Sequence, residues 1–152
     1  MRSALISIAA LLATAVIGCQ TTDIRSAESA ANILEVLISG IEIHPYQTMT
    51  EPSGTITVAV TNLTHEEITV SHVSVTPTED PYYRFEAGFH RDPKTIQPGD
   101  DGLFEITLRG MTRAGVPRQE RSSIVRLRII VGLSTGENYA YHFETFVVER
   151  RG

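Results

Sequence analysis

From Ile33 onward, apolar and polar residues alternate in short runs separated by turn residues, and this period of two is the strongest constraint on the fold. The clearest run is Gly54 to Thr61, in which Ile56, Val58 and Val60 alternate with Thr55, Thr57, Ala59 and Thr61. Successive side chains of a strand point to opposite faces, so this run predicts a strand with one buried face and one wet face. No later segment sustains a helical period, and the sequence therefore predicts an all-β domain.

Six further runs complete about seven predicted strands: Val36 to His44, Glu67 to Thr76, Tyr82 to Glu86, Leu103 to Arg109, Ser123 to Leu133 and Tyr139 to Glu149. The apolar face changes phase near His72, which predicts a β-bulge. The segment 134–138 contains turn residues and predicts a long hairpin of the last two strands. Asn62-Leu63-Thr64 matches a glycosylation sequon, but we interpret it as a polar hairpin turn.

The start of the chain has the organisation of a signal peptide. Met1 and Arg2 supply a positive end, and the sixteen residues from Ser3 to Gly18 carry no charge. As a helix they would reach about 24 Å at about 1.5 Å per residue, which is less than the hydrocarbon core of about 30 Å. A permanent transmembrane anchor is therefore the weaker alternative.

The apolar run ends in Val16-Ile17-Gly18-Cys19, which resembles the lipobox of bacterial lipoproteins. The resemblance implies that residues 1–18 are removed and that Cys19 receives the lipid, with Gly18 small enough for the peptidase. Val16 and Ile17 depart mildly from the commonest pattern. An unmodified cysteine in an apolar helix is the alternative, but Cys19 is the only cysteine, so no intramolecular disulfide competes for its thiol.

Removal of eighteen residues from 152 leaves 134, a length that suits one domain. We expect a lipidated, flexible tether over residues 19–32 and a β-domain over residues 33–152, although the sequence around Ser26 to Leu37 also allows a short helix. By resemblance to sorted lipoproteins, Gln20 implies the periplasmic face of the outer membrane in a cell with two membranes. In a cell with one membrane it implies the outer leaflet.

The order of the predicted strands, with a turn at Thr61 to Thr64 and another at Pro98-Gly99-Asp100, resembles generic bacterial immunoglobulin-like domains. The resemblance covers most of the mature chain with loose motifs, and the paired cysteines and core tryptophan of antibody domains are missing. It implies an immunoglobulin-like or fibronectin-like β-sandwich of about seven strands. A shared architecture transfers no function.

Motifs for catalysis and metal binding are missing from the sequence. The five histidines never form an HxH or HExxH spacing, and the acidic doublets at Glu66, Glu79 and Asp100 occur in strands or turns where solvation is the simpler interpretation. There is no GxSxG motif and no glycine-rich phosphate loop. We therefore expect no enzyme activity, no metal and no cofactor.

The charge pattern indicates a possible contact surface. Loss of Arg2 leaves 12 basic against 18 acidic residues, a net charge of −6 that argues against nucleic-acid binding. Against this background, six arginines lie between Arg109 and Arg128 with Glu120 as the only acid. Arginine engages phosphate and carboxylate groups bidentately, so we select Arg113, Arg118 and Arg121 as candidate binding residues. The alternative is a solvated hairpin whose arginines pair with acidic turns.

Three classes of function remain after these exclusions. The first is a lipid-anchored binding or assembly module, a non-catalytic accessory subunit of a cell-envelope complex, whose partners are the membrane and an envelope protein or polymer. The second is a pilotin-like or chaperone-like lipoprotein that receives a strand at a free sheet edge. The third is a hydrolase acting on wall or surface polymer. The sequence leaves open the oligomeric state, the partner and the choice between inner and outer membrane.

Overall fold

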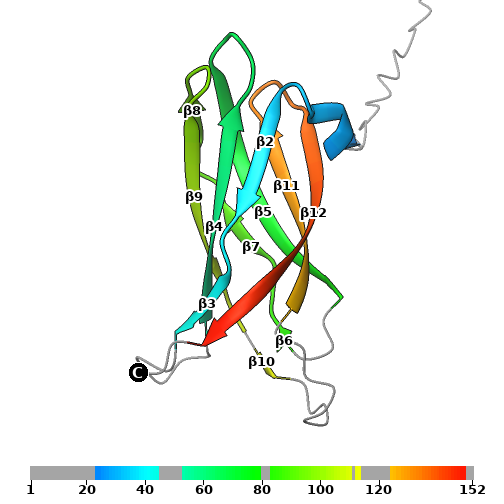
Figure 1. Ribbon diagram of the computed structural model, residues 1–152, viewed down its shortest axis with the longest axis vertical. Coiled ribbons are helices and arrows are strands. Elements are labelled where there is room, and N and C mark those ends of the chain that lie inside the picture. Colours follow the sequence, from blue (N-terminus) through cyan, green and yellow to red (C-terminus); the bar gives the residue numbers. More distant parts are fainter. Residues whose placement is uncertain (1–22, 45–52, 80–82, 111, 114–123, 150–152) are drawn as a thin grey trace, which may run out of the picture.

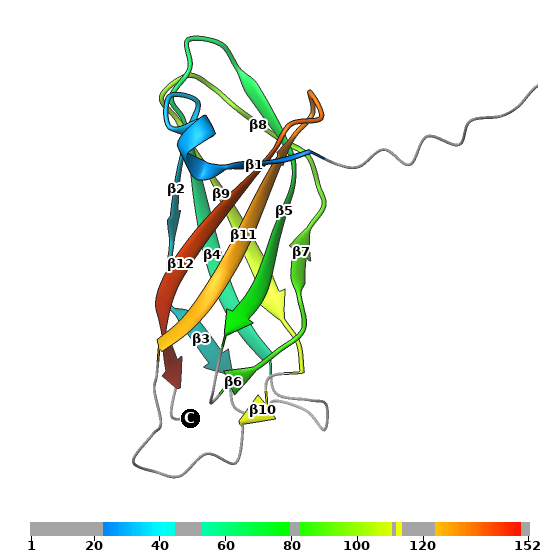
Figure 2. The same cartoon turned by 90° about the vertical axis from the view of Figure 1, so that its right-hand side faces the viewer.

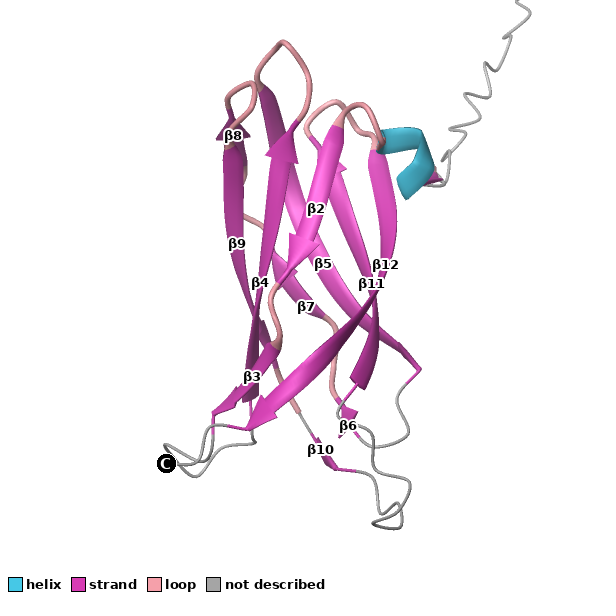
Figure 3. Cartoon of the chain, viewed as in Figure 1, coloured by secondary structure: helices cyan, strands magenta, loops and turns pink. Residues whose placement is uncertain are grey.

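The computed structural model describes residues 23–44, 53–79, 83–110, 112–113 and 124–149, and in these ranges the protein is almost entirely β-structure (Figures 1 and 3). The elements are β1 (Ile24–Ser26), η1 (Ala27–Ala30), β2 (Leu34–Ile38), β3 (Ile41–His44), β4 (Ser53–Asn62), β5 (Ile68–Glu79), β6 (Tyr83–Arg84), β7 (Gly88–His90), β8 (Lys94–Ile96), β9 (Asp101–Leu108), β10 (Thr112–Arg113), β11 (Ile124–Leu133) and β12 (Asn138–Glu149). The expectation of an all-β domain is confirmed.

Ten of the strands form one curled, mixed sheet whose two halves face each other (Figure 2). One half contains β12, β11, β5 and β7, with β1 and β8 attached, and the other contains β2, β3, β4 and β9. Strand β12 joins the halves because its last residues, from Val147 to Glu149, pair in parallel with β3. A separate pair, β6 and β10, lies near the end where β11 begins.

The core lies between the two halves and follows the predicted alternation. Strand β4 buries Ile56, Val58 and Val60, and β9 buries Phe104, Ile106 and Leu108 against them. The opposite half contributes a second row, namely Val125, Leu127, Ile129 and Val131 of β11. All ten of these side chains are fully buried, so the inward face predicted for Gly54 to Thr61 is confirmed, and β9 and β11 show the same alternation.

The predicted bulge and hairpin are also present. In the ladder of β5 with β11, His72 pairs with Gly132 and Val70 pairs with Leu133, so Ser71 is the extra residue. Strands β11 and β12 pair over nine residues on each side of the 134–137 turn. The single strand expected over Val36 to His44 is instead broken into β2 and β3 at Ser39 and Gly40. Both strands pair with β4, and β3 also pairs with β12.

Part of the expected tether is folded. Strand β1 pairs in parallel with β12 through Ile24 to Ser26, and Ala30 of η1 is completely buried. The expected signal peptide, residues 1–18, and Cys19 lie outside the described residues. Within the described part of the chain, no helix has the length and apolarity needed to cross a membrane.

Candidate binding face

The three candidate arginines are only partly covered by the structure. Arg118 and Arg121 lie outside the described residues, and Arg113 is described as a backbone position in β10, where it pairs with Tyr83 of β6. Tyr83 and Phe85 are themselves buried in the core, so they belong to the interior and do not form a contact patch. The β6–β10 pair therefore attaches the start of the arginine-rich segment to the body of the domain.

The end of that segment continues into the outward face of β11. Because Val125, Leu127 and Ile129 point inward, the intervening Arg126 and Arg128 point outward. Arg126 donates from Nε to Oε1 of Glu144 on β12 at 2.8 Å, and both side chains are exposed. Arg128 is half-buried beside His142 in the register.

Large apolar side chains are exposed on the same face. Ile124 of β11 lies directly opposite Phe146 of β12, and Phe146 is 62% exposed. Val148 follows on the same side of β12 and is also exposed; it lies at the margin of this face, where β12 pairs with β3, and is opposite Glu42. Across the half-sheet, Phe89 of β7 is exposed beneath the guanidinium of Arg91, which lies 5.3 Å from the ring centre. We call the outer surface formed by Phe89, Arg91, Ile124, Arg126, Arg128, Phe146 and Val148 the basic face.

The outer surface of the other half-sheet has the opposite character. Leu37 of β2, Ala59 of β4 and Leu103 of β9 lie in one cross-strand row. Acidic residues surround this row, and Asp101 accepts a hydrogen bond from Oγ1 of Thr61 at 2.6 Å. Lys94 lies at the margin and donates from Nζ to the carbonyl of Leu103. We call the surface formed by Glu35, Leu37, Ala59, Asp101, Leu103 and Glu105 the acidic face.

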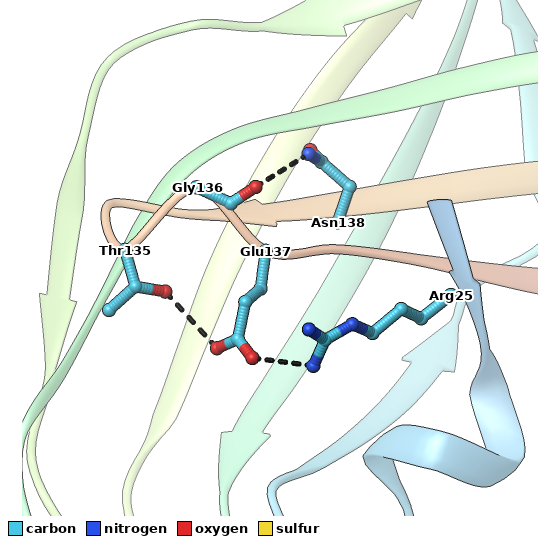
Figure 4. A network of polar contacts seen from close by, with 5 residues as sticks. All are labelled: Arg25, Thr135, Gly136, Glu137 and Asn138. Atoms are coloured by element: carbon cyan, nitrogen blue, oxygen red, sulfur yellow. Dashed lines mark hydrogen bonds and ion pairs between the residues drawn. The ribbon is translucent and has the colours of Figure 1, made fainter. Parts of the chain in front are cut away.

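Strand β1 is fixed to the turn that joins β11 and β12 (Figure 4). Arg25 donates from Nη1 to Oε1 of Glu137 at 2.7 Å, and Oγ1 of Thr135 donates to the other carboxylate oxygen at 3.2 Å. Asn138 closes the turn by donating to the carbonyl of Gly136. The N-terminal end of the described chain therefore lies on the half-sheet that carries the basic face.

A strand from a partner can pair only with a free edge of the sheet, and the free edge of β12 is short. One side of β12 pairs with β11, and its other side is occupied by β1 at Asn138 to Ala140 and by β3 at Val147 to Glu149. Between them, Thr145 donates to the carbonyl of Ser39, and Gly40 approaches so closely that an added Cβ would lie 3.2 Å from the carbonyl oxygen of Phe146. On this side of β12, Tyr141 to Glu144 remain open. Among the described strands, β2 and β9 each form a ladder on one side, with β4, so longer edges lie in the other half-sheet.

Two buried tyrosines lie on the inward side of β12. The hydroxyl groups of Tyr139 and Tyr141 have no hydrogen-bond partner among the described residues. Burial, followed by the nearby Tyr139, raises the pKa of Tyr141 to about 12. A phenol that stays neutral to such a high pH is a poor general base, so Tyr141 is not suited to that role at neutral pH.

The described residues include no group of three or more histidine, cysteine, aspartate or glutamate side chains that could hold a metal ion. His72 and His142 do not meet, because β11 separates their strands and they lie opposite Gly132 and Arg128, respectively.

Sequence reasoning missed the apolar part of the basic face. Phe146 and Val148 occur in the run Phe143 to Val148, where apolar residues occupy both strand faces. The sequence did contain a signal for Ile124. Val125, Leu127 and Ile129 define the inward face of the strand, and Ile124 is an apolar residue on the opposite face. Phe89 gave no such signal because its strand is only three residues long.

No family model matches the chain, and no curated protein matches it in sequence. Solved structures share a β-rich fold with it at low identity. A FixG-related protein from Vibrio parahaemolyticus is 14% identical, with 75% of this chain and 95% of that chain covered and a TM-score of 0.37. A protein from Archaeoglobus fulgidus is 12% identical, with 74% and 91% covered and a TM-score of 0.41. The periplasmic chaperone SfaE is 9% identical, with 77% and 58% covered and a TM-score of 0.37. This likeness is confined to the general fold and supports no argument about function.

Proposed function

We propose that this protein is a lipid-anchored, non-catalytic binding or assembly module of the bacterial cell envelope, an accessory subunit held at the periplasmic face of the outer membrane through Cys19. Its contact surface is the basic face, which continues into the segment that contains Arg113, Arg118 and Arg121. The expected partner is an anionic component of the envelope. The domain itself is proposed to be an immunoglobulin-like sandwich, a view supported by the two half-sheets that face each other across the core.

The observation that carries this proposal is the exposed row of Ile124, Phe146 and Val148 beside two arginines. Solvent-exposed aromatic and branched side chains in register are unfavourable in water, and contiguous apolar surface flanked by charge is typical of contact sites. Arginine supplies bidentate hydrogen bonds to phosphate or carboxylate. The combination suits a partner with anionic groups next to apolar ones.

The anchor is tested with Cys19→Ser. We expect the variant to fold, because Cys19 lies outside the described core, and to leave the membrane fraction. The measurements are cell fractionation and metabolic labelling with a clickable fatty acid. Labelling of Cys19→Ser at the wild-type level would refute the lipid anchor.

The contact surface is tested with a photo-crosslinking amino acid placed at Phe146, in the basic face, or at Leu103, in the acidic face. Leu103 is a matched control because it is 59% exposed, against 62% for Phe146. We expect the probe at Phe146 to capture an envelope component, whether protein, polymer or lipid, in much higher yield. Equal yields at the two positions would argue against the basic face as the contact surface.

A further inference from the structure

The structure limits how far the domain can move from a lipid attached to Cys19. Strand β1 is held by its ladder with β12 and by the Arg25–Glu137 ion pair at 2.7 Å. Four peptide steps separate Cys19 from Asp23, the first described residue. At a maximum of about 3.6 Å per residue, this segment spans at most about 14 Å. The tether therefore holds the end of this half-sheet at Asn138 to Ala140 close to the bilayer surface, and Phe146 lies farther along β12.

The two outer faces differ in how they would interact with that surface. Anionic headgroups attract arginine and repel carboxylates, and aromatic side chains favour the interfacial region. The basic face presents Arg91, Arg126 and Arg128 with Phe89 and Phe146. Two acidic residues neighbour Arg126 in the sheet: Glu144 is paired with it, and Glu79 lies opposite it in the ladder of β5 with β11. The acidic face presents Glu35, Asp101 and Glu105 around its leucine pair.

We infer that the basic face lies against the anionic phospholipid headgroups of the membrane that holds the anchor, and that the acidic face points towards the aqueous compartment. This inference rests on the proposed lipid anchor and names the anionic partner of the proposed function. The lipid chains supply the attachment, and the short tether gives the basic face a high effective concentration at the surface, so weak contacts suffice to orient the domain. Leu37 and Leu103 are then presented to proteins on the aqueous side.

The test uses the mature lipoprotein reconstituted into vesicles of phosphatidylethanolamine and phosphatidylglycerol. Because Cys19 is the only cysteine, its acylation leaves any introduced cysteine as the only free thiol. Val148→Cys places a fluorophore on the basic face and leaves Phe146 intact, and Leu103→Cys is the matched control, with the native side chains 51% and 59% exposed. A quencher attached to the lipid headgroups then reports which face is near the bilayer.

We expect quenching of the Val148→Cys label to exceed that of the Leu103→Cys label several-fold. The difference should shrink in vesicles of phosphatidylcholine alone, and when Arg126 and Arg128 are both replaced by Gln, because the attraction needs both the anionic lipid and the arginines. Equal quenching at the two positions, or stronger quenching at Leu103→Cys, would overturn the inferred orientation.

Failure of the anchor is distinguishable from failure of the orientation. A protein without a lipid would not float with the vesicles in a density gradient, and that result would refute both the anchor and the inference. A protein that floats but shows no preference between the two labels would retain the anchor and lose the inferred orientation. Selective protein capture by the Phe146 probe in cells, together with no preference in vesicles, would retain the proposed contact face and assign it to a protein partner.

Discussion

The hydroxyl groups of Tyr139 and Tyr141 are buried without a hydrogen-bond partner among the described residues. A buried donor without a partner loses its bonds to water and gains nothing in return. We therefore expect Tyr141→Phe and Tyr139→Phe to leave the domain as stable as the wild type or to stabilise it by about 1 kcal/mol. Urea unfolding at pH 7 measures this change. A loss of about 1 kcal/mol or more in either variant would mean that the hydroxyl is bonded in solution.

The raised pKa of Tyr141 has its own consequence at alkaline pH. The pKa is about 12 in the folded protein and 10.0 for an unperturbed tyrosine. The unfolded chain therefore releases this proton first, so the contribution of Tyr141 to stability is fully present below pH 10 and is lost as the pH rises through about 12. We expect urea midpoints to fall between pH 9 and pH 11.5, and to fall less in Tyr141→Phe. An identical decline in both proteins would refute the shift.

The alternation in β11 makes a sharp prediction about neighbouring residues. Leu127 and Ile129 are fully buried, whereas Arg128 between them is half-buried on the outer side. Truncation of a buried leucine or isoleucine to alanine costs about 2 to 5 kcal/mol, so Leu127→Ala and Ile129→Ala should lower the free energy of unfolding by that amount. Arg128→Ala should cost less than about 1 kcal/mol. Equal losses at Leu127 and Arg128 would contradict the assigned strand faces.

At the scale of elements, the β4–β5 turn depends on one buried amide. Nδ2 of Asn62 donates to the carbonyls of Glu66 at 2.8 Å and Ile96 at 3.0 Å, and its Oδ1 accepts from the backbone N–H and the hydroxyl of Thr64. Asn62 thereby joins its own turn to the strand β8. A polar turn is present at the predicted place, but the prediction of a hairpin was wrong, because β4 and β5 do not pair with each other and lie in opposite half-sheets. Asn62 holds this turn and the β8 segment together.

We expect Asn62→Ala to lower the free energy of unfolding by about 2 to 4 kcal/mol, because it leaves several polar groups unbonded in a buried position. Thr61→Val is the matched control: it removes the exposed bond to Asp101 and should cost about 1 kcal/mol or less. Chemical unfolding of the two variants checks the difference. Similar small losses in both would show that solvent replaces the bonds of Asn62.

The elements differ in how far the sequence predicts them. Strands β4, β9, β11 and β12 were predicted because each is long enough for period-two alternation to show. Strand β1 was not predicted, and neither was the parallel pairing of β3 with β12, since a segment of three or four residues that pairs with a distant strand leaves no local pattern. All three residues of β1 are exposed, so its sequence contains no apolar phase at all. The break at Gly40 depends on its close approach to β12, which only the fold reveals.

At the scale of the whole molecule, the two outer faces combine residues that are distant in the sequence. The sheet brings Phe89, Arg128 and Phe146 onto one face, because β7, β5, β11 and β12 are adjacent in it. The charge count along the sequence predicted only the arginine-rich segment. That segment leaves β10 at Arg113 and returns to the sheet at Ile124, within the basic face. The candidate arginines and the exposed apolar row are therefore connected by a short stretch of chain.

The last prediction concerns Arg113, Arg118 and Arg121, which precede the basic-face residue Ile124 in the sequence. Replacement of all three by Gln should reduce crosslinking from a probe at Phe146 and leave the melting temperature nearly unchanged, because exposed charges contribute little to stability. Crosslinking by the wild type should also weaken with salt, since the Debye length falls from about 10 Å at 0.1 M to about 3 Å at 1 M.

Arg25→Gln is the control, because Arg25 pairs with Glu137 at the other end of β12. Crosslinking at both salt concentrations, run beside a thermal melt, measures these effects. Full, salt-insensitive crosslinking by the triple variant would show that these arginines only solvate their segment.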